Sequence, residues 1–217
     1  MDWDNREVRK RVWRGQTEAD WAEPVLAEVR RGGKILLYCG IHHAFTGFRQ
    51  PRVDRGRFQG PGDLRFGNHL REALGGRAVT VFLHAPWEGA GGYGTRSVHP
   101  AAGRIDAFML ARQDGPFAVG FDVAGSPLAD LPIDDAVYRH GRERFTLAEF
   151  CDGWIYTKPI GQYEPVTYID GWIHAGNLER ARATAMNPVW RTLSVEQLED
   201  GCRSYLDDFR RFCGHLR

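Results

Sequence analysis

The sequence predicts an α/β fold with a mostly parallel sheet, flanking helices and a C-terminal helix in a single layered domain. Two apolar runs, at 34–39 and 78–87, have the composition of strands that are covered on both faces. A helical stretch lies between them, and strand–loop–helix–strand is the order of a βαβ unit. The last segment, 195–213, keeps one continuous apolar face at helical spacing.

We expect residues 1–217 to form one domain with three parts. An N-terminal helical segment covers 1–33, a βα core covers 34–158, and a C-terminal helical extension covers 159–217. The sequence contains no internal repeat and no low-complexity linker, and 217 residues are enough for one large domain.

Local signals place the elements of this domain in order. Thr17 and Asp20 resemble a capping box for a first helix at 18–31, and a Gly-Gly pair follows it. Ser194 and Gln197 form a capping box for the last helix. Between them we expect strands at 34–39, 78–87, 117–123 and 150–158, helices at 64–76, 103–112 and 177–185, and long loops at 41–62 and 88–103.

Composition and charge exclude several classes of protein. The formal net charge is +1, with 29 Lys and Arg against 28 Asp and Glu, so no long-range field attracts nucleic acid or an anionic membrane. No run of 18 apolar residues is present to span a bilayer. The four cysteines form no C-x-x-C pair, and there is no signal peptide, so we expect a reduced, cytoplasmic protein.

Histidines follow the two strongest predicted strands. His42 and His43 come directly after the run at 34–39, and His84, with Trp87 close behind, ends the second run. Ligands of open parallel sheets bind beyond the carboxyl ends of the strands, so these side chains would share one rim. His99 lies in the glycine-rich loop at 88–103, which we expect to fold over that rim.

Two interpretations of the histidine pair stay open. Histidine near neutral pH acts as a base or a metal ligand, and several on one rim would suit water-mediated or metal-assisted hydrolysis. The alternative is that the pair hydrogen-bonds to loop carbonyls and holds the turn. The functional interpretation assigns catalysis to His43, His42 and His84, metal binding to His43 and His84, and substrate binding to Arg49, Trp87, Tyr93 and His99.

A catalytic histidine needs a carboxylate as its orienting partner or as a shared metal ligand. The sequence offers four acids near the expected rim, namely Asp54, Asp63, Glu88 and Asp122. It offers no G-x-S-x-G elbow, P-loop or H-E-x-x-H motif.

Two stretches resemble the second half of the erythromycin-esterase-like, ChaN-like and Tiki/TraB superfamily. They are "GKILLYCGIHHA" and "RFGNHLREALGGRAVTVFLH". In that superfamily a strand ends in a G-x-x-H motif, and a helix of the form G-x-x-L-R-E-x-L-G leads into another strand. Here Gly40 to His43 match the G-x-x-H motif, which assigns the family histidine to His43. "PFAVGFDVAGSPLADL" and "FCDGWIYTKPIGQYEPVT" are similar to the closing strands, so the resemblance covers roughly residues 17 to 170.

The resemblance implies a hydrolase of esters or peptides, with Mn, Co or Zn as the expected metal, or a haem-binding protein. The haem-iron ligands would be Tyr38, Tyr93 and the histidines. The superfamily also has an upstream half, which we do not find before Gly40. Three functions therefore stay open: a hydrolase for a small-molecule or peptide substrate, a binding module without turnover, and a structural or partner subunit completed by another chain or another copy.

Overall fold

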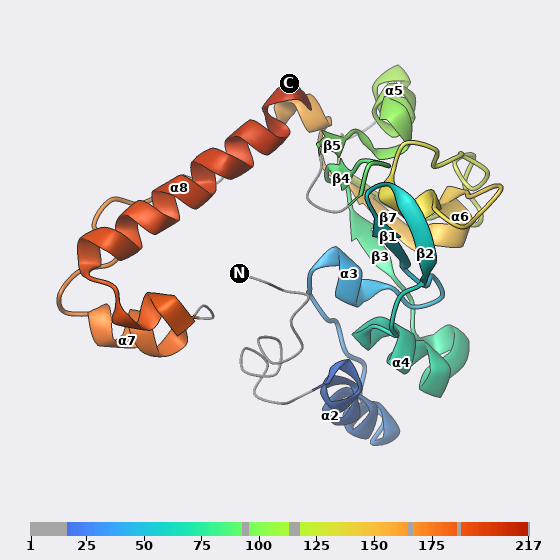
Figure 1. Cartoon of the computed structure of the whole chain (residues 1–217). Helices are drawn as coiled ribbons and strands as arrows, with labels where there is room; N and C mark the ends of the chain where they lie inside the picture. The colour runs from blue at the N-terminus through green and yellow to red at the C-terminus, as the bar shows by residue number, and fades with distance from the viewer. Residues whose placement is uncertain (1–16, 93–95, 113–117, 165–166, 186–187, 217) are drawn as a thin grey trace. The chain divides into compact units, whose positions relative to one another are not determined.

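A computed structural model of the chain describes residues 17–92, 96–112, 118–164, 167–185 and 188–216 (Figure 1). The described chain divides into two compact units, one formed by residues 18–163 with Leu216 and the other by residues 164–215 with Thr17. The sequence predicted one domain with an extension that begins at 159, and the second unit begins at 164.

Three of the five helices that the structure describes in the first unit were predicted, and the short helices at 41–44 and 147–150 were not. The five helices are α2 (Glu18–Arg30), α3 (Ile41–Ala44), α4 (Phe66–Leu74), α5 (Arg104–Ala111) and α6 (Leu147–Phe150). Short 3₁₀ turns accompany them at η1 (Gly75–Arg77), η2 (Pro100–Gly103), η3 (Val137–Arg139) and η4 (Ile160–Gln162). The predictions at 18–31, 64–76 and 103–112 are confirmed within a few residues at each end.

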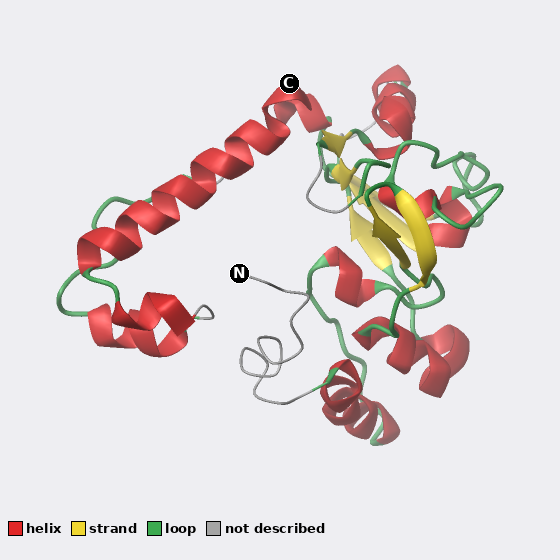
Figure 2. Cartoon of the chain, in the orientation of Figure 1, coloured by secondary structure: helices red, strands yellow, loops and turns green. Residues whose placement is uncertain are grey.

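Three strands form the central sheet of the first unit (Figure 2). They are β3 (Val81–Leu83), β7 (Gly153–Tyr156) and β6 (Val119–Asp122), in the order β3–β7–β6. β3 pairs with β7 in parallel, and β6 pairs with β7 antiparallel. The class is therefore mixed α/β, and one of the two pairings in this described sheet is parallel.

The predicted strand at 34–39 is not a strand in this structure. The segment is extended but pairs with no strand of the described chain, and Leu36 and Tyr38 are 98% and 90% exposed. A run of apolar residues favours a strand only when a neighbouring strand accepts its backbone hydrogen bonds. β3, the strand expected beside segment 34–39, is present as an edge strand of the described sheet. Its edge away from β7 is unpaired there.

Two hairpins lie where long loops were predicted. β1 (Pro51–Asp54) and β2 (Arg57–Pro61) pair antiparallel inside the expected loop at 41–62. Arg55 and Gly56 form the tight turn between them, with φ of 46° and 74°, the left-handed values that a two-residue hairpin loop requires. β4 (Trp87–Glu88) and β5 (Ser97–Val98) form a second hairpin in the expected loop at 88–103.

One face of the central sheet carries the main core. Phe82, Trp154 and Tyr156 point from β3 and β7 into a cluster of buried aromatic rings that includes Phe45 and Phe150. On the opposite face Val81, Leu83 and Ile155 stay largely exposed. Because side chains alternate along a strand, the same three strands give one covered face and one open apolar face.

A second, smaller core joins α2 to α4. Ala22 and Leu26 of α2 pack against Phe66 and Leu70 of α4. Gly67 permits this helix to approach the backbone before it, because a Cβ at Gly67 would lie 2.5 Å from the carbonyl oxygen of Phe45. The glycine of the G-x-x-L-R-E-x-L-G pattern is therefore required by packing rather than by backbone conformation.

The second unit is helical in its described part. It contains α7 (Leu178–Thr184), η5 (Pro188–Thr192) and α8 (Val195–Cys213), and η6 (Gly214–Leu216) follows. The predicted Ser194–Gln197 capping box is present at the start of α8. Arg182 donates to the carbonyl oxygen of Leu193 from two guanidinium nitrogens, which ties α7 to the entry of α8. In the part of the chain that the structure describes, no helix is long and apolar enough to cross a membrane.

Candidate functional site

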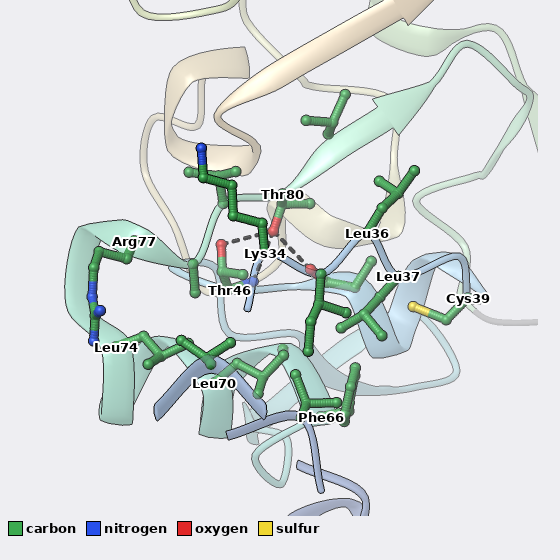
Figure 3. Close-up of a pocket in the computed structure, with 18 of the residues that line it drawn as sticks. Lys34, Leu36, Leu37, Cys39, Thr46, Phe66, Leu70, Leu74, Arg77 and Thr80 are labelled. Carbon is green, nitrogen blue, oxygen red and sulfur yellow. Dashed lines mark hydrogen bonds between the residues drawn. The ribbon is translucent and has the colours of Figure 1, made fainter. Parts of the chain in front are cut away.

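A cavity of about 710 Å³ opens in the first unit between the extended segment 34–39, helices α2 and α4, and the start of β3 (Figure 3). This volume lies within the range of cavities that bind small molecules. Phe66, Leu70 and Leu74 line one side, and Figure 3 shows Arg77 beside Leu74 at one end and Cys39 at the other. His43 also lines the cavity, so the predicted catalytic histidine lies at a site of suitable size.

Glu18 is the carboxylate partner of His43. Its Oε2 lies 2.9 Å from Nδ1 of His43 and accepts a hydrogen bond from the backbone N–H of Phe66 at 2.6 Å. Its Oε1 accepts from Nη1 of Arg65 at 2.9 Å. The carboxylate is mostly buried, and three donors from α3 and the start of α4 hold it in place.

These contacts control the charge of Glu18. Burial raises the pKa of the Glu18 carboxyl, but the hydrogen bonds from His43, Arg65 and Phe66 outweigh it, and the net shift lowers the pKa below its usual value. In the imidazole tautomer that carries its proton on Nδ1, this N–H donates to the ionised Glu18 and the lone pair is on Nε2. The arrangement is the carboxylate–imidazole pair that orients a general base in many hydrolases.

His42 has a different environment from its neighbour. Its Nε2 lies 3.1 Å from the hydroxyl of Tyr138, and its ring lies against Phe45. Burial, together with the nearby charges of Arg65 and His43, lowers the pKa of His42 to about 4. His42 is therefore neutral at physiological pH and joins the loop to the aromatic core, which favours a supporting role.

Two threonines fix the floor of the cavity. The hydroxyl of Thr80 donates to the carbonyl oxygen of Ala44 at 2.7 Å and lies 2.7 Å from the hydroxyl of Thr46. Asp152 accepts from the backbone N–H of Thr80 at 2.7 Å, so the starts of β3 and β7 are joined as well. Figure 3 shows the Thr46–Thr80 pair between the two ends of the cavity. This network places α3, and with it His43, at the amino end of β3.

His84 belongs to a separate polar cluster. The side chain is 1% exposed, and its Nε2 lies 2.9 Å from Oδ1 of Asp106. Asp106 also accepts from the hydroxyl of Tyr156 at 3.1 Å, and Nδ1 of His99 lies 3.4 Å from its second oxygen. Burial raises the pKa of Asp106, but the hydrogen bonds from His84, Ile160 and Tyr156 give a net lowering.

His43 and His84 do not share a rim, contrary to the prediction. The network at Thr80 places α3 before β3, whereas His84 follows β3. The rise of a strand puts roughly 13 Å between residues 80 and 84. The prediction required both histidines to follow the carboxyl ends of two paired parallel strands. The first of those strands, segment 34–39, is not formed.

The residues expected to hold a metal do not fit one. His43 and His84 each contact a different carboxylate, and the described residues contain no group of three or more His, Cys, Asp or Glu side chains that could hold a metal ion. Of the expected haem ligands, Tyr38 is exposed and does not line the cavity, and His43 does line it. Tyr93 lies outside the described residues.

Two of the predicted substrate contacts, Arg49 and Trp87, are not among the residues that line the cavity. Nε of Arg49 donates to the carbonyl oxygen of Gly62 at 2.8 Å, so this side chain bridges the ends of the β1–β2 hairpin. Trp87 is 2% exposed and packs against Phe150 and Trp154 in the main core. A fully buried ring cannot meet a substrate at a rim, so the assignment of Trp87 to substrate binding is corrected.

Sequence reasoning missed both carboxylates that contact the histidines. Glu18 and Asp106 were passed over for Asp54, Asp63, Glu88 and Asp122, which follow strands. Asp106 carries a usable signal, because it stands between Ile105 and Met109, two buried residues of a short helix. Glu18 carries none, since its partners are 25 and 47 positions away along the chain.

Comparisons with protein-family models, with curated proteins and with solved structures find no match to this chain. The resemblance to the erythromycin-esterase-like, ChaN-like and Tiki/TraB superfamily stays a prediction from the sequence.

Proposed function

We propose that the cavity beside His43 is the site of a hydrolase that cleaves an ester or amide with a water molecule. One observation carries the proposal: His43 lines the cavity, and its Nδ1 lies 2.9 Å from the mostly buried carboxylate of Glu18. The resemblance of Gly40–His43 to the G-x-x-H motif supports the same residue from the sequence. His43 is the catalytic base of this proposal, and Glu18 is its positioning residue.

The reaction follows from the orientation of the imidazole. Neutral His43 takes a proton from water on Nε2 as the water oxygen bonds to the acyl carbon. The carbonyl π electrons move to oxygen in the tetrahedral intermediate. When that intermediate collapses, the bond to the leaving alkoxide or amine breaks, and the imidazolium returns the proton to it. Glu18 stabilises the imidazolium between these two steps, and no step passes through a metal.

A pair of histidine variants tests the proposal. We expect His43→Gln to lower kcat/KM for p-nitrophenyl butanoate by about 100-fold or more, because proton transfer by a positioned base contributes that much. His69→Gln is the matched control, since His69 lies on α4, faces Glu72 at 3.8 Å and does not line the cavity. Full activity in His43→Gln, with an unchanged melting temperature, would refute the assignment.

The lining of the cavity favours a second candidate function, the binding of an apolar ligand without turnover. Most of the lining side chains are aliphatic, as in sites that bind by burial of apolar surface. A wild-type protein that binds an apolar ligand but cleaves neither ester nor amide probes would favour this second candidate over the hydrolase.

We propose in addition that the mostly parallel sheet forms when segment 34–39 pairs with the open edge of β3. What supports it is that residues 34–37 and residues 79–81 line the same cavity from two sides. Pairing of segment 34–39 with β3 would close the cavity. The paired strand and a bound ligand therefore exclude one another. A reducing, cytoplasmic setting is part of the proposal too, supported by the free thiols of Cys39, Cys151 and Cys202.

A further inference from the structure

One wall of the cavity is an apolar stripe along α4. Phe66, Leu70 and Leu74 follow one another at intervals of one helical turn on α4, and all three line the cavity (Figure 3). This stripe is roughly 12 Å long, because an α-helix rises 1.5 Å per residue. Val25 and Val29, also one turn apart, line the cavity from α2. An apolar wall of this length fits a linear apolar group better than a compact one.

The two ends of the stripe differ. Arg77 lies next to Leu74 at one end (Figure 3). At the other end α4 begins at Phe66, whose backbone N–H donates to the same Glu18 oxygen that lies 2.9 Å from Nδ1 of His43. The apolar stripe therefore starts near His43 and ends near Arg77.

We infer that the cavity takes an unbranched aliphatic acyl chain. The acyl carbon would lie near His43, and the chain would extend along Phe66, Leu70 and Leu74. The substrate class is then a long-chain acyl ester, and its hydrolysis gives an alcohol and a fatty-acid anion. The hydrolytic part of this inference rests on the proposed function, whereas the binding of the chain does not.

Titration calorimetry with two soluble probes tests the chain site. Dodecanoate is expected to bind with one molecule per protein, and butanoate to show no measurable binding, because each methylene removed weakens binding by roughly three- to fourfold. Equal binding of butanoate and dodecanoate would overturn the inference.

Matched variants locate the site of binding. Val79 lines the cavity and is largely exposed, so Val79→Glu should fold and weaken dodecanoate by about tenfold or more. Leu83→Glu makes the same change on the open face of β3 outside the cavity lining and should leave binding unchanged. Equal losses in Val79→Glu and Leu83→Glu would mean that the probe binds the open sheet face instead.

Turnover separates this inference from the proposed function. We expect p-nitrophenyl dodecanoate to be cleaved with a lower KM than the butanoate ester, and Val79→Glu to abolish that difference. If the protein binds dodecanoate but cleaves neither ester, the acyl-chain binding site is supported and the proposed hydrolase function is refuted. Cleavage of both esters with equal KM, and no binding of dodecanoate, would keep the hydrolase and refute the chain site.

Discussion

Nδ1 of His43 lies 2.9 Å from Oε2 of Glu18, although the two residues are 25 positions apart in the chain. The same carboxylate accepts from Arg65 and from the backbone of Phe66. Helix α2, the G-x-x-H segment and the start of α4 therefore meet at one buried charge. This contact gives the histidine at the cavity the orientation that a general base needs.

Glu18→Gln should impair catalysis more than binding. A glutamine oxygen in the place of Oε2 still accepts from the backbone of Phe66 and faces Nδ1 of His43, but it offers no negative charge to the imidazolium, and its NH2 group then meets Nη1 of Arg65, a second donor. We expect kcat for p-nitrophenyl butanoate to fall roughly 10²–10⁴-fold, with the affinity for dodecanoate nearly unchanged. Glu72→Gln is the control, because Glu72 faces His69 on exposed α4 surface. A change confined to KM would contradict the positioning role.

The helices were predictable because their signals are local. α4 and α8 follow from apolar residues at helical spacing, and the box of Ser194 and Gln197 marks the start of α8 within the residues that form it. The structure of segment 34–39 was not predictable, because an apolar run becomes a strand only when it pairs with another strand elsewhere in the chain. The β1–β2 hairpin had a signal, the Arg55–Gly56 turn, that the surrounding Gly, Arg and Pro residues obscured.

The candidate site was half predictable for the same reason. His43 was found from a motif whose residues are adjacent in the sequence. Glu18 and Asp106 act through tertiary contacts. Glu18 resembles an ordinary acid in the first turn of a helix, whereas Asp106 stands beside the apolar Ile105. The prediction that His43 and His84 share one rim of the sheet was wrong, because it depended on the pairing of two strands.

Gly67→Ala tests the close approach of α4 to the loop before it. Helix propensity alone predicts that alanine would stabilise α4 by up to about 1 kcal/mol. The new Cβ would lie 2.5 Å from the carbonyl oxygen of Phe45, so we expect instead a loss of roughly 1–3 kcal/mol in the free energy of unfolding. Urea denaturation measures it, with Gly76→Ala as a control that meets nothing within 4 Å. A stabilised Gly67→Ala variant would contradict the packing.

The buried imidazole of His42 should make stability depend on pH. Burial lowers the pKa of His42 in the folded protein from 6.5 to about 4. Between these values the unfolded chain binds more protons, so the free energy of unfolding falls as the pH drops below 6.5 and is unaffected above it. From pH 7 to pH 5 we expect a loss of about 2 kcal/mol.

His42→Gln isolates this contribution, because glutamine does not titrate. Urea denaturation of both proteins at pH 7 and pH 5 should show a smaller pH effect in the variant by the amount assigned to His42. Glu18 and Asp106 have lowered pKa values, so their contributions are present at pH 5 and are lost only at more acidic pH. Identical pH dependence in the two proteins would show that His42 is not buried as a neutral ring.

Amide hydrogen exchange distinguishes the open cavity from the closed sheet. No hydrogen bond is present for residues 34–39 within the described chain, so their amides should exchange within seconds to minutes in the ligand-free protein. Amides of β7, which pairs on both sides, should exchange far more slowly. Mass spectrometry of peptides covering 34–39 and 153–156 measures both in one sample. Slow exchange at 34–39 would show that the segment pairs with the edge of β3. In that case dodecanoate should accelerate exchange there, because the chain and the strand would compete for the same space.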